Sequence, residues 1–343
     1  MNKHDACEAV LNAGLRLAGA GLIVRTWGNV SCRVDGEHFV ITPSGRAYET
    51  LTPDDIVVCL TADASYSGGI KPSSEKRLHA LIYRERKDAE FVIHTHQKYA
   101  SAAACVPESS FPDLSIGCVP LAAYGLPGSK KLLATATAAL PQADHAMLLA
   151  RHGVLCWGGD PDDAFETALS LEKAYKQAVL ERCTGAFDGG REDVKAVASG
   201  VPPELLPGID EIKDAVYKVR KDLCFIEFTS DAALASIAAA GAPLLAMLDD
   251  FAQIAGRTAL TAKSLSPADV VASLGRRQGI LLPGIGALCG AHSQSDAYAV
   301  RLVMEKNALA QVYAENFGKA RPIPAAECAL MRFVYKYSYS KRK

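Results

Sequence analysis

The first apolar positions of the chain recur with the spacing of a helix, and Asp5 stands where a helix cap is expected. These positions are Val10, Leu11, Leu15, Leu17 and Ala18. Residues 19–21 are a Gly-Ala-Gly stretch that favours the end of a helix. We therefore predict a first helix with one buried face.

The pattern then changes to the alternation typical of strands. Two such runs within residues 29–42 flank Asp35-Gly36. This dipeptide readily adopts the positive φ angles of a tight hairpin turn. The pattern predicts a β-hairpin over residues 29–42.

Strands and helices alternate from there to residue 182. The run 74–86 predicts an amphipathic helix with Leu78, Leu81 and Ile82 on one side, and Ser73 or Ser74 would cap it. The other elements predicted here are strands over 56–60, 90–94, 146–150 and 153–157 and helices over 128–140 and 162–182. The last two strands flank a short turn at Arg151-His152.

The regular pattern ends between residues 184 and 210, where Gly, Pro and charged residues dominate. Such a composition indicates a linker. We expect a first domain over residues 1–188, a linker over 189–208 and a second domain over 209–343.

The second half of the chain repeats part of the first at an ungapped shift of 133 residues. Nine identical pairs result, too many for chance: Leu148/Leu281, Leu149/Leu282, Gly153/Gly286, Leu155/Leu288, Cys156/Cys289, Asp163/Asp296, Ala164/Ala297, Glu172/Glu305 and Lys173/Lys306. The copy is truncated, because about 20 residues precede its first strand, predicted over 223–229. Ile285 stands at the position of His152, so we expect a degenerate copy that lost the chemistry.

Composition narrows the class of protein. The chain has 343 residues, 49% of them hydrophobic, and 37 basic against 38 acidic side chains give a formal net charge of −1. No basic field is available for nucleic acid or an anionic membrane. The N-terminal residues are polar, and the longest uncharged stretch, 232–248, contains Pro243 and is too short to span a bilayer, so we interpret it as a buried helix plus a turn.

Ten cysteines are scattered without any CxxC pair, and most lie in apolar runs, as buried free thiols do. This favours a reducing, cytoplasmic compartment. The average composition excludes the disordered and disulfide-stapled classes. We therefore expect a soluble α/β or α+β protein.

Three histidines form a candidate metal site. His94 and His96 are two residues apart at the end of an apolar strand, and the period of two places both imidazoles on one face. An HxH pair can also be purely structural, but His152 follows in an Arg-His-Gly turn where Gly153 can relax the backbone. Three imidazoles leave one coordination position open, which is the pattern of a catalytic rather than a structural zinc site.

Glu75 and the serines before it have two interpretations. The carboxylate would either stabilise the first turn of a helix or, near a metal, ligate the ion or move protons. Ser73 and Ser74 would cap the helix or leave its free amides to a phosphate group. The turns at 26–29 and 42–45 supply further small, amide-rich segments, whereas Walker and GxGxxG motifs are absent from the sequence.

These motifs together resemble the class II aldolase/adducin family, and especially its zinc-dependent fuculose-phosphate aldolases. The segments that carry the resemblance are GNVS from Gly28, TPSG from Thr42, KPSSE from Lys71, HTH from His94 and LLARHG ending at Gly153. They occur in the family's order and approximate spacing over about residues 8–183. Each motif is common alone, but the set is specific.

The resemblance implies a three-layer α/β/α domain with a central, largely antiparallel sheet, followed here by the truncated copy. It implies His94, His96 and His152 as ligands of Zn²⁺ or another divalent metal, with Glu75 as a fourth ligand or a base. It also implies a phosphate pocket formed by Gly28, Asn29, Ser44, Gly45, Ser73 and Ser74. Related phosphopentose 4-epimerases typically carry Asp at the carboxylate position, so Glu75 favours carbon–carbon cleavage.

The chain departs from the family at the proton donor. The aldolases carry a tyrosine in a segment resembling PYATFG, whereas this chain reads Pro120-Leu121-Ala122-Ala123-Tyr124-Gly125, with Leu121 in the tyrosine's place. Tyr124 is the candidate replacement, and the C-terminal tyrosines Tyr335, Tyr337 and Tyr339 are alternatives. The run 318–337 resembles the closing segment of single-domain members, so the extra half-domain would have been inserted before it.

The function expected from the sequence is that of a metal-dependent aldolase acting on a small phosphorylated ketose. A 4-epimerase, a decarboxylase and a non-enzymatic adducin-like interaction protein are the alternatives, and the intact His triad argues against the last. The related aldolases form cyclic tetramers whose active sites lie against a neighbour. We therefore expect a homo-oligomer, either a dimer of tandem chains or a tetramer.

Overall fold

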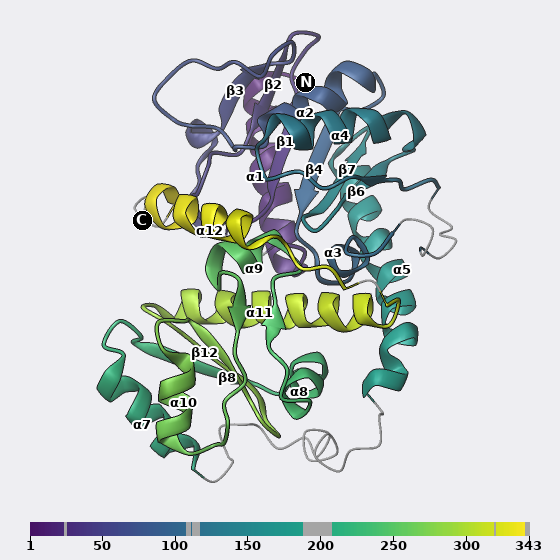
Figure 1. Ribbon diagram of the computed structural model, residues 1–343. Helices are drawn as coiled ribbons and strands as arrows, with labels where there is room; N and C mark the ends of the chain where they lie inside the picture. Colours follow the sequence, from purple (N-terminus) through teal and green to yellow (C-terminus); the bar gives the residue numbers. More distant parts are fainter. Residues whose placement is uncertain (24–25, 108–110, 112–116, 188–207, 319, 340–343) are drawn as a thin grey trace. The chain divides into compact units, whose positions relative to one another are not determined.

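The computed structural model describes residues 1–343 except 24–25, 108–110, 112–116, 188–207, 319 and 340–343. The described chain divides into two compact units: unit 1 comprises Met1–Ala178 with Ser338 and Tyr339, and unit 2 comprises Val179–Tyr337. The colours in Figure 1 follow the sequence and distinguish most of unit 1 from unit 2. The predicted linker, 189–208, lies outside the described residues except for Gly208.

Unit 1 is built on a seven-stranded sheet in the order β3-β2-β1-β4-β7-β6-β5. All neighbouring strands are antiparallel except β5 and β6. The strands are β1 (Asn29–Arg33), β2 (His38–Ile41), β3 (Val57–Leu60), β4 (Phe91–Thr95), β5 (Leu121–Ala122), β6 (Ala146–Leu149) and β7 (Gly153–Gly158). The predicted largely antiparallel sheet is confirmed.

Helices cover this sheet. Side chains of α2 (Lys76–Glu85) and α4 (Lys130–Ala139) share a buried cluster with Met147, Leu155 and Trp157 of β6 and β7. Three further helices complete the unit: α1 (Lys3–Gly19) packs on β1 and β2, α3 (Lys98–Ala103) packs on β6 and β7, and α5 (Pro161–Phe187) follows β7. The three-layer α/β/α architecture is confirmed.

Two local predictions need correction. The hairpin β1-β2 is present, but Gly36 does not take a positive φ. The carboxylate of Asp35 accepts hydrogen bonds from the backbone N–H groups of Glu37 and His38 instead, so a side-chain-stabilised loop replaces the tight turn. The expected cap of α2 by Ser73 or Ser74 is wrong, because Glu75 occupies the cap position.

Unit 2 has a three-stranded antiparallel sheet in the order β11-β12-β8 and a two-stranded sheet, β10-β9. Its strands are β8 (Phe225–Thr229), β9 (Leu244–Leu245), β10 (Thr258–Ala259), β11 (Gly279–Leu282) and β12 (Gly286–Ala291). Its helices are α7 (Ile209–Val219), α8 (Ala232–Ala239), α9 (Asp249–Ile254), α10 (Pro267–Leu274), α11 (Gln294–Glu315) and α12 (Ala325–Val334). The buried helix predicted at the start of 232–248 is α8.

Several elements of the two units have matching bounds. At the 133-residue shift, β6 falls on β11, β7 falls on β12, and the first residues of α5 and α11 coincide. Val154 pairs with Thr95 in unit 1, and the shifted residue Ala287 pairs with Thr229 in unit 2. A Cβ atom on Gly153 would collide with the Thr95 carbonyl oxygen, and one on Gly286 would collide with that of Thr229. The same close backbone approach therefore requires glycine in both units.

The correspondence reaches further upstream than the repeat found in the sequence. A shift of 134 residues places β4 on β8 and α2 on α7. The ends of these helices and the segments that follow them then share four identical pairs: Tyr83/Tyr217, Arg86/Arg220, Lys87/Lys221 and Asp88/Asp222. Within the described part of unit 2, no strands correspond to β1, β2 and β3.

Two further expectations concern the environment of the chain. All ten cysteines are free thiols, and seven are buried, as the sequence pattern predicted. None of the helices in the described part of the chain combines the length and apolar character needed to cross a lipid bilayer.

Candidate metal centre

Strand β4 delivers the first two imidazoles. His94 lies near the end of the strand and His96 directly after it, and their Nε2 atoms are 3.0 Å apart. The predicted placement on one face is therefore observed. The Nδ1–H group of His94 donates to the backbone oxygen of Val154 on the neighbouring strand (2.8 Å), so Nε2 carries the lone pair that faces the site.

His152 comes from the turn between β6 and β7, and its Nε2 lies 3.1 Å from Nε2 of His94. The turn differs from the prediction. Arg151, not Gly153, takes the left-handed conformation, with φ at 62°. Gly153 is needed because the strand it opens lies against the Thr95 carbonyl, where a side chain would collide.

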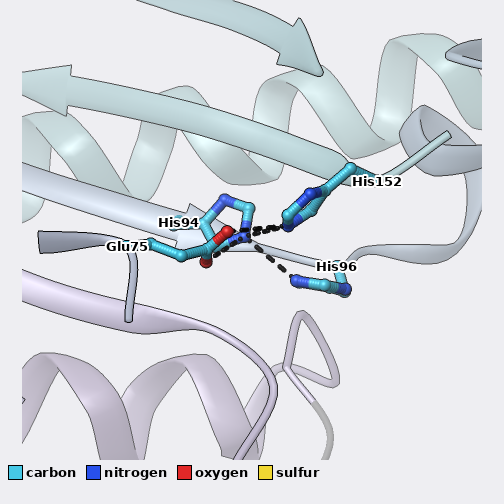
Figure 2. A group of neighbouring side chains, drawn as sticks. All are labelled: Glu75, His94, His96 and His152. Carbon is cyan, nitrogen blue, oxygen red and sulfur yellow. Dashed lines mark hydrogen bonds and ion pairs between the residues drawn. The ribbon is translucent and has the colours of Figure 1, made fainter. Parts of the chain in front are cut away.

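Glu75 closes the group from the cap position of α2 (Figure 2). Its Oε2 lies 3.0 Å from Nε2 of His94, and its Oε1 lies 3.0 Å from Nε2 of His152. The ligand atoms of Glu75, His94, His96 and His152 all lie within 4.8 Å of one another. The structure thus brings together all four residues predicted as metal ligands.

The charge state of Glu75 follows from its surroundings. Burial of the carboxylate, the largest single influence, opposes its ionisation. The charge and hydrogen-bond interactions with His94 and His152 act against burial. Together they hold the pKa of Glu75 well below its usual range, so the carboxylate is an anion.

The arrangement suits a divalent cation. Ligand atoms about 2.0–2.1 Å from a tetrahedral zinc ion lie roughly 3.4 Å from one another, close to the 3.0–3.1 Å separations seen here. Converging lone pairs of neutral imidazoles repel each other unless a proton or a cation lies between them. Three nitrogen ligands and one anionic oxygen are also the donor set that such an ion prefers.

The candidate phosphate segments also lie together. The backbone N–H of Ser44 donates to the Lys71 carbonyl (2.9 Å), and that of Ser73 donates to the Thr42 carbonyl (3.0 Å). The small-residue turn around Ser44-Gly45 thus lies beside the Ser73-Ser74 segment. Ser74 and Glu75 in turn line a small pocket whose other residues are Arg77, Leu78, Gly128, Ser129, Leu132 and Leu133.

Gly28 and Asn29 lie on the metal side of this region. Gly28 takes φ of 122°, and a Cβ there would press on Ile23 and on the His94 carbonyl. The Asn29 amide is directed inward: Nδ2 donates to Oε2 of Glu75 (3.1 Å), and Oδ1 accepts from Nε2 of His79. Asn29 therefore contacts the candidate base rather than only lining a phosphate pocket.

Tyr124 follows β5, the short strand that contains Leu121. The guanidinium of Arg151 lies 5.6 Å from the centre of the Tyr124 ring. Arg151 immediately precedes His152, so the structure connects Tyr124 with the turn that presents a metal ligand. Tyr335 and Tyr337 belong to unit 2, in the segment Tyr335–Tyr339 after α12.

The sequence analysis missed His79. This imidazole is fully buried on α2 and bonded to both Asn29 and Ser31. Burial in the first place, with the positive field of His94, lowers its pKa to about 3, so His79 is neutral. The available signal was a polar stripe, Glu75, His79 and Tyr83, recurring every four residues on an otherwise amphipathic helix.

Unit 1 is an α/β domain with a candidate metal centre. The end of one strand, the turn between two others and the cap of a helix supply three imidazoles and a carboxylate to it. A sequence model described as "Class II Aldolase and Adducin N-terminal domain" matches residues 8–179. The chain belongs to this family, which includes enzymes of the aldolase and epimerase type.

Individual proteins are similar to about half of this chain. An L-ribulose-5-phosphate 4-epimerase, UlaF, of Salmonella paratyphi C is 32% identical over 193 residues, which cover 51% of this chain and 84% of that protein. An L-fuculose 1-phosphate aldolase structure is 30% identical, with a TM-score of 0.48 over 53% of this chain and 88% of that one. An l-fuculose-1-phosphate aldolase from Thermus thermophilus is 27% identical, with a TM-score of 0.42 over 51% and 94% of the two chains.

Proposed function

We propose that this protein is a zinc-dependent aldolase that cleaves a small phosphorylated ketose. The observation that carries the proposal is the buried convergence of the Glu75 carboxylate with three imidazoles. A divalent cation held there by His94, His96 and His152 would act as a Lewis acid that stabilises the negative charge of an enediolate. Membership of the class II aldolase family and the names of the relatives support a sugar-phosphate substrate.

The residues of the chain divide the remaining work. In the condensation direction the anionic Glu75 carboxylate removes a proton from the carbon that attacks the aldehyde. In cleavage it first takes up a proton, from the substrate or from water, and delivers it to the enediolate carbon. Ser44, Ser73 and Ser74 bind the phosphate group through their hydroxyl groups, and Gly45 binds it through its backbone amide. Tyr124 accepts the proton from the hydroxyl group that becomes the aldehyde carbonyl during cleavage, and donates it back to the aldehyde oxygen in the condensation direction, in place of the residue that Leu121 replaces.

A 4-epimerase is the second candidate. The 32% identical relative carries that name, and an epimerase of this type breaks and remakes the same carbon–carbon bond. The presence of Glu rather than Asp at position 75 favours the aldolase. A decarboxylase would use the same scaffold, whereas an adducin-like interaction protein would have no need for the converging donor set.

The test is to incubate the Zn²⁺-loaded chain with a panel of ketose phosphates and measure aldehyde release by coupled reduction. An aldolase releases aldehyde, and an epimerase interconverts two ketose phosphates without accumulating it. His96→Ala is the control for metal-dependent turnover. Neither product with any phosphorylated ketose would overturn the proposed substrate class.

We propose further that residues 209–343 are a degenerate copy that completes the assembly of a homo-oligomer, either a dimer of tandem chains or a tetramer. The matched strand bounds and registers of the two units support a copy. A copy within the same chain has a high effective concentration for pairing with the first domain. Residues 1–190 alone should be less soluble and less active than the whole chain, and a fully active, monodisperse fragment would contradict this role.

A further inference from the structure

A line of buried polar side chains extends from Glu75 along the contact between α2 and β1. On the helix it comprises Glu75, His79 and Tyr83, and on the strand Asn29 and Ser31. Four helical residues advance by about 6 Å and two strand residues by about 6.6 Å, so the two series stay in step. We refer to these five residues as the polar zipper.

Consecutive members of the polar zipper are joined by hydrogen bonds. Tyr83 Oη lies 2.7 Å from Ser31 Oγ, and Ser31 Oγ lies 2.6 Å from Nδ1 of His79. Nε2 of His79 lies 2.5 Å from Oδ1 of Asn29, whose Nδ2 donates to Oε2 of Glu75 (3.1 Å). Every link lies in the interior, where an unmade hydrogen bond is costly.

The chemistry of the groups fixes the direction of these bonds. The Glu75 carboxylate only accepts, so the Asn29 amide presents Nδ2 to it and Oδ1 to His79. His79 must then carry its proton on Nε2, which leaves Nδ1 to accept from the Ser31 hydroxyl. Ser31 has one proton, so Tyr83 donates to Ser31, and every donor points toward Glu75.

We propose that His79 is a positioning residue, which, through the Asn29 amide, holds the Glu75 carboxylate in the orientation that serves the metal centre. The proposal rests on the proposed function of that centre. The opposite tautomer of His79 would turn Oδ1 of Asn29 toward the anionic oxygen and repel it. Burial lowers the pKa of His79 to about 3, so this imidazole is neutral. It therefore adds no positive charge next to the three ligand imidazoles.

The test compares His79→Leu with His79→Gln. Glutamine retains a donor for Asn29 at a similar volume, and leucine does not. Loss of an outer hydrogen bond to a metal ligand typically lowers metal affinity about 10–100-fold, so we expect such a loss for His79→Leu and recovery of most of it for His79→Gln. The measurement is competition with a chelator, together with the visible absorption spectrum of the Co²⁺-substituted chain.

Two further variants separate positioning from general stability. Ile82→Ala removes a buried apolar side chain of the same helix that lies outside the polar zipper, and it should leave metal affinity and the Co²⁺ spectrum unchanged. Ser31→Ala removes the hydroxyl group that donates to Nδ1 of His79 and leaves the sequence of α2 unchanged. It should weaken metal binding by at least about threefold, because an indirect partner of a metal ligand is lost. Ser31→Ala therefore decides the question if His79→Leu does not fold.

Wild-type affinity and spectrum in folded His79→Leu, or in Ser31→Ala, would overturn the positioning role. An equal loss of affinity in Ile82→Ala would also overturn it, because the effect would then be one of stability alone. A wild-type chain that binds no metal would instead contradict the proposed function, so the two failures are distinguishable.

Discussion

The two units differ most at the positions that form the candidate metal centre. At the structural correspondence, Glu75 falls on Ile209, His94 on Phe228, His96 on Ser230 and His152 on Ile285. Ile209, Phe228 and Ile285 are buried and belong to one hydrophobic cluster in unit 2. Elements with matching bounds therefore carry a polar donor set in unit 1 and an apolar core in unit 2.

One turn has the same unusual conformation in both units, although Gly286 takes a positive φ of 133° and Gly153 does not. Arg151 and Gly284 correspond and have φ angles of 62° and 70°. Glycine adopts this conformation freely, whereas a residue with a side chain pays about 1–2 kcal/mol for it. The turn thus requires the left-handed conformation in both units, and only unit 1 combines it with a large side chain beside the metal centre.

The largest effect is expected when unit 1 is given the residue of unit 2. His152→Ile should lower turnover by roughly 10³-fold or more, because loss of a ligand removes several kcal/mol of metal-ion stabilisation. The measurement is kcat at saturating Zn²⁺ with the substrate identified by the aldehyde assay. The reciprocal change, Ile285→His, should create no metal site, and a second bound ion there would break the comparison.

Glu75→Gln tests the carboxylate without removing an imidazole. We expect the fold to remain and metal affinity to fall at least as much as in His79→Leu, although the ion still binds at saturating Zn²⁺. Turnover at saturating Zn²⁺ should fall about 10²–10⁴-fold, because an amide cannot transfer a proton. Single-turnover kinetics and metal content measure the two effects separately. Glu85→Gln, on the exposed end of the same helix, is the matched control, and near-normal turnover in Glu75→Gln would remove this residue from the mechanism.

The glycine that opens β7 and β12 provides a matched pair. Gly153→Ala and Gly286→Ala should each lower the free energy of unfolding by about 1–3 kcal/mol, because the added Cβ overlaps a carbonyl of the neighbouring strand. Chemical denaturation measures both. Gly153→Ala should also weaken metal binding, and Gly286→Ala should not. An equal loss of metal affinity in Gly286→Ala would show that the comparison fails.

The sequence predicted elements whose apolar residues recur with a clear helical or strand period. It also predicted site residues that a short motif identifies. The spacing of His94 and His96 placed both on one face, and Glu75 was named before its contacts were known. The turn at Arg151 and the cap of α2 were wrong in detail because they depend on contacts between strands distant in the sequence. His79 was missed for the same reason, since its partners Asn29 and Ser31 belong to another element.

The smallest effect is expected at the candidate phosphate segments. Ser44→Ala should lower kcat/KM about 5–10-fold for a phosphorylated substrate, which corresponds to about 1.0–1.4 kcal/mol and lies within the range of a typical hydrogen bond. It should change kcat/KM little for the non-phosphorylated analogue. Unit 2 has no counterpart of β2 and the turn after it within its described residues, so this site should exist once per chain. Equal losses for both substrates would count against a phosphate pocket there.

The central claim is that one metal ion binds per chain and that unit 1 holds it. The most direct test is elemental analysis of the purified chain and of His96→Ala after dialysis against a chelator and reloading with Zn²⁺. The account predicts one equivalent of zinc in the wild-type chain and little in His96→Ala, with losses in affinity typical of a missing ligand. Two equivalents in the wild type, or one equivalent retained by His96→Ala, would contradict it.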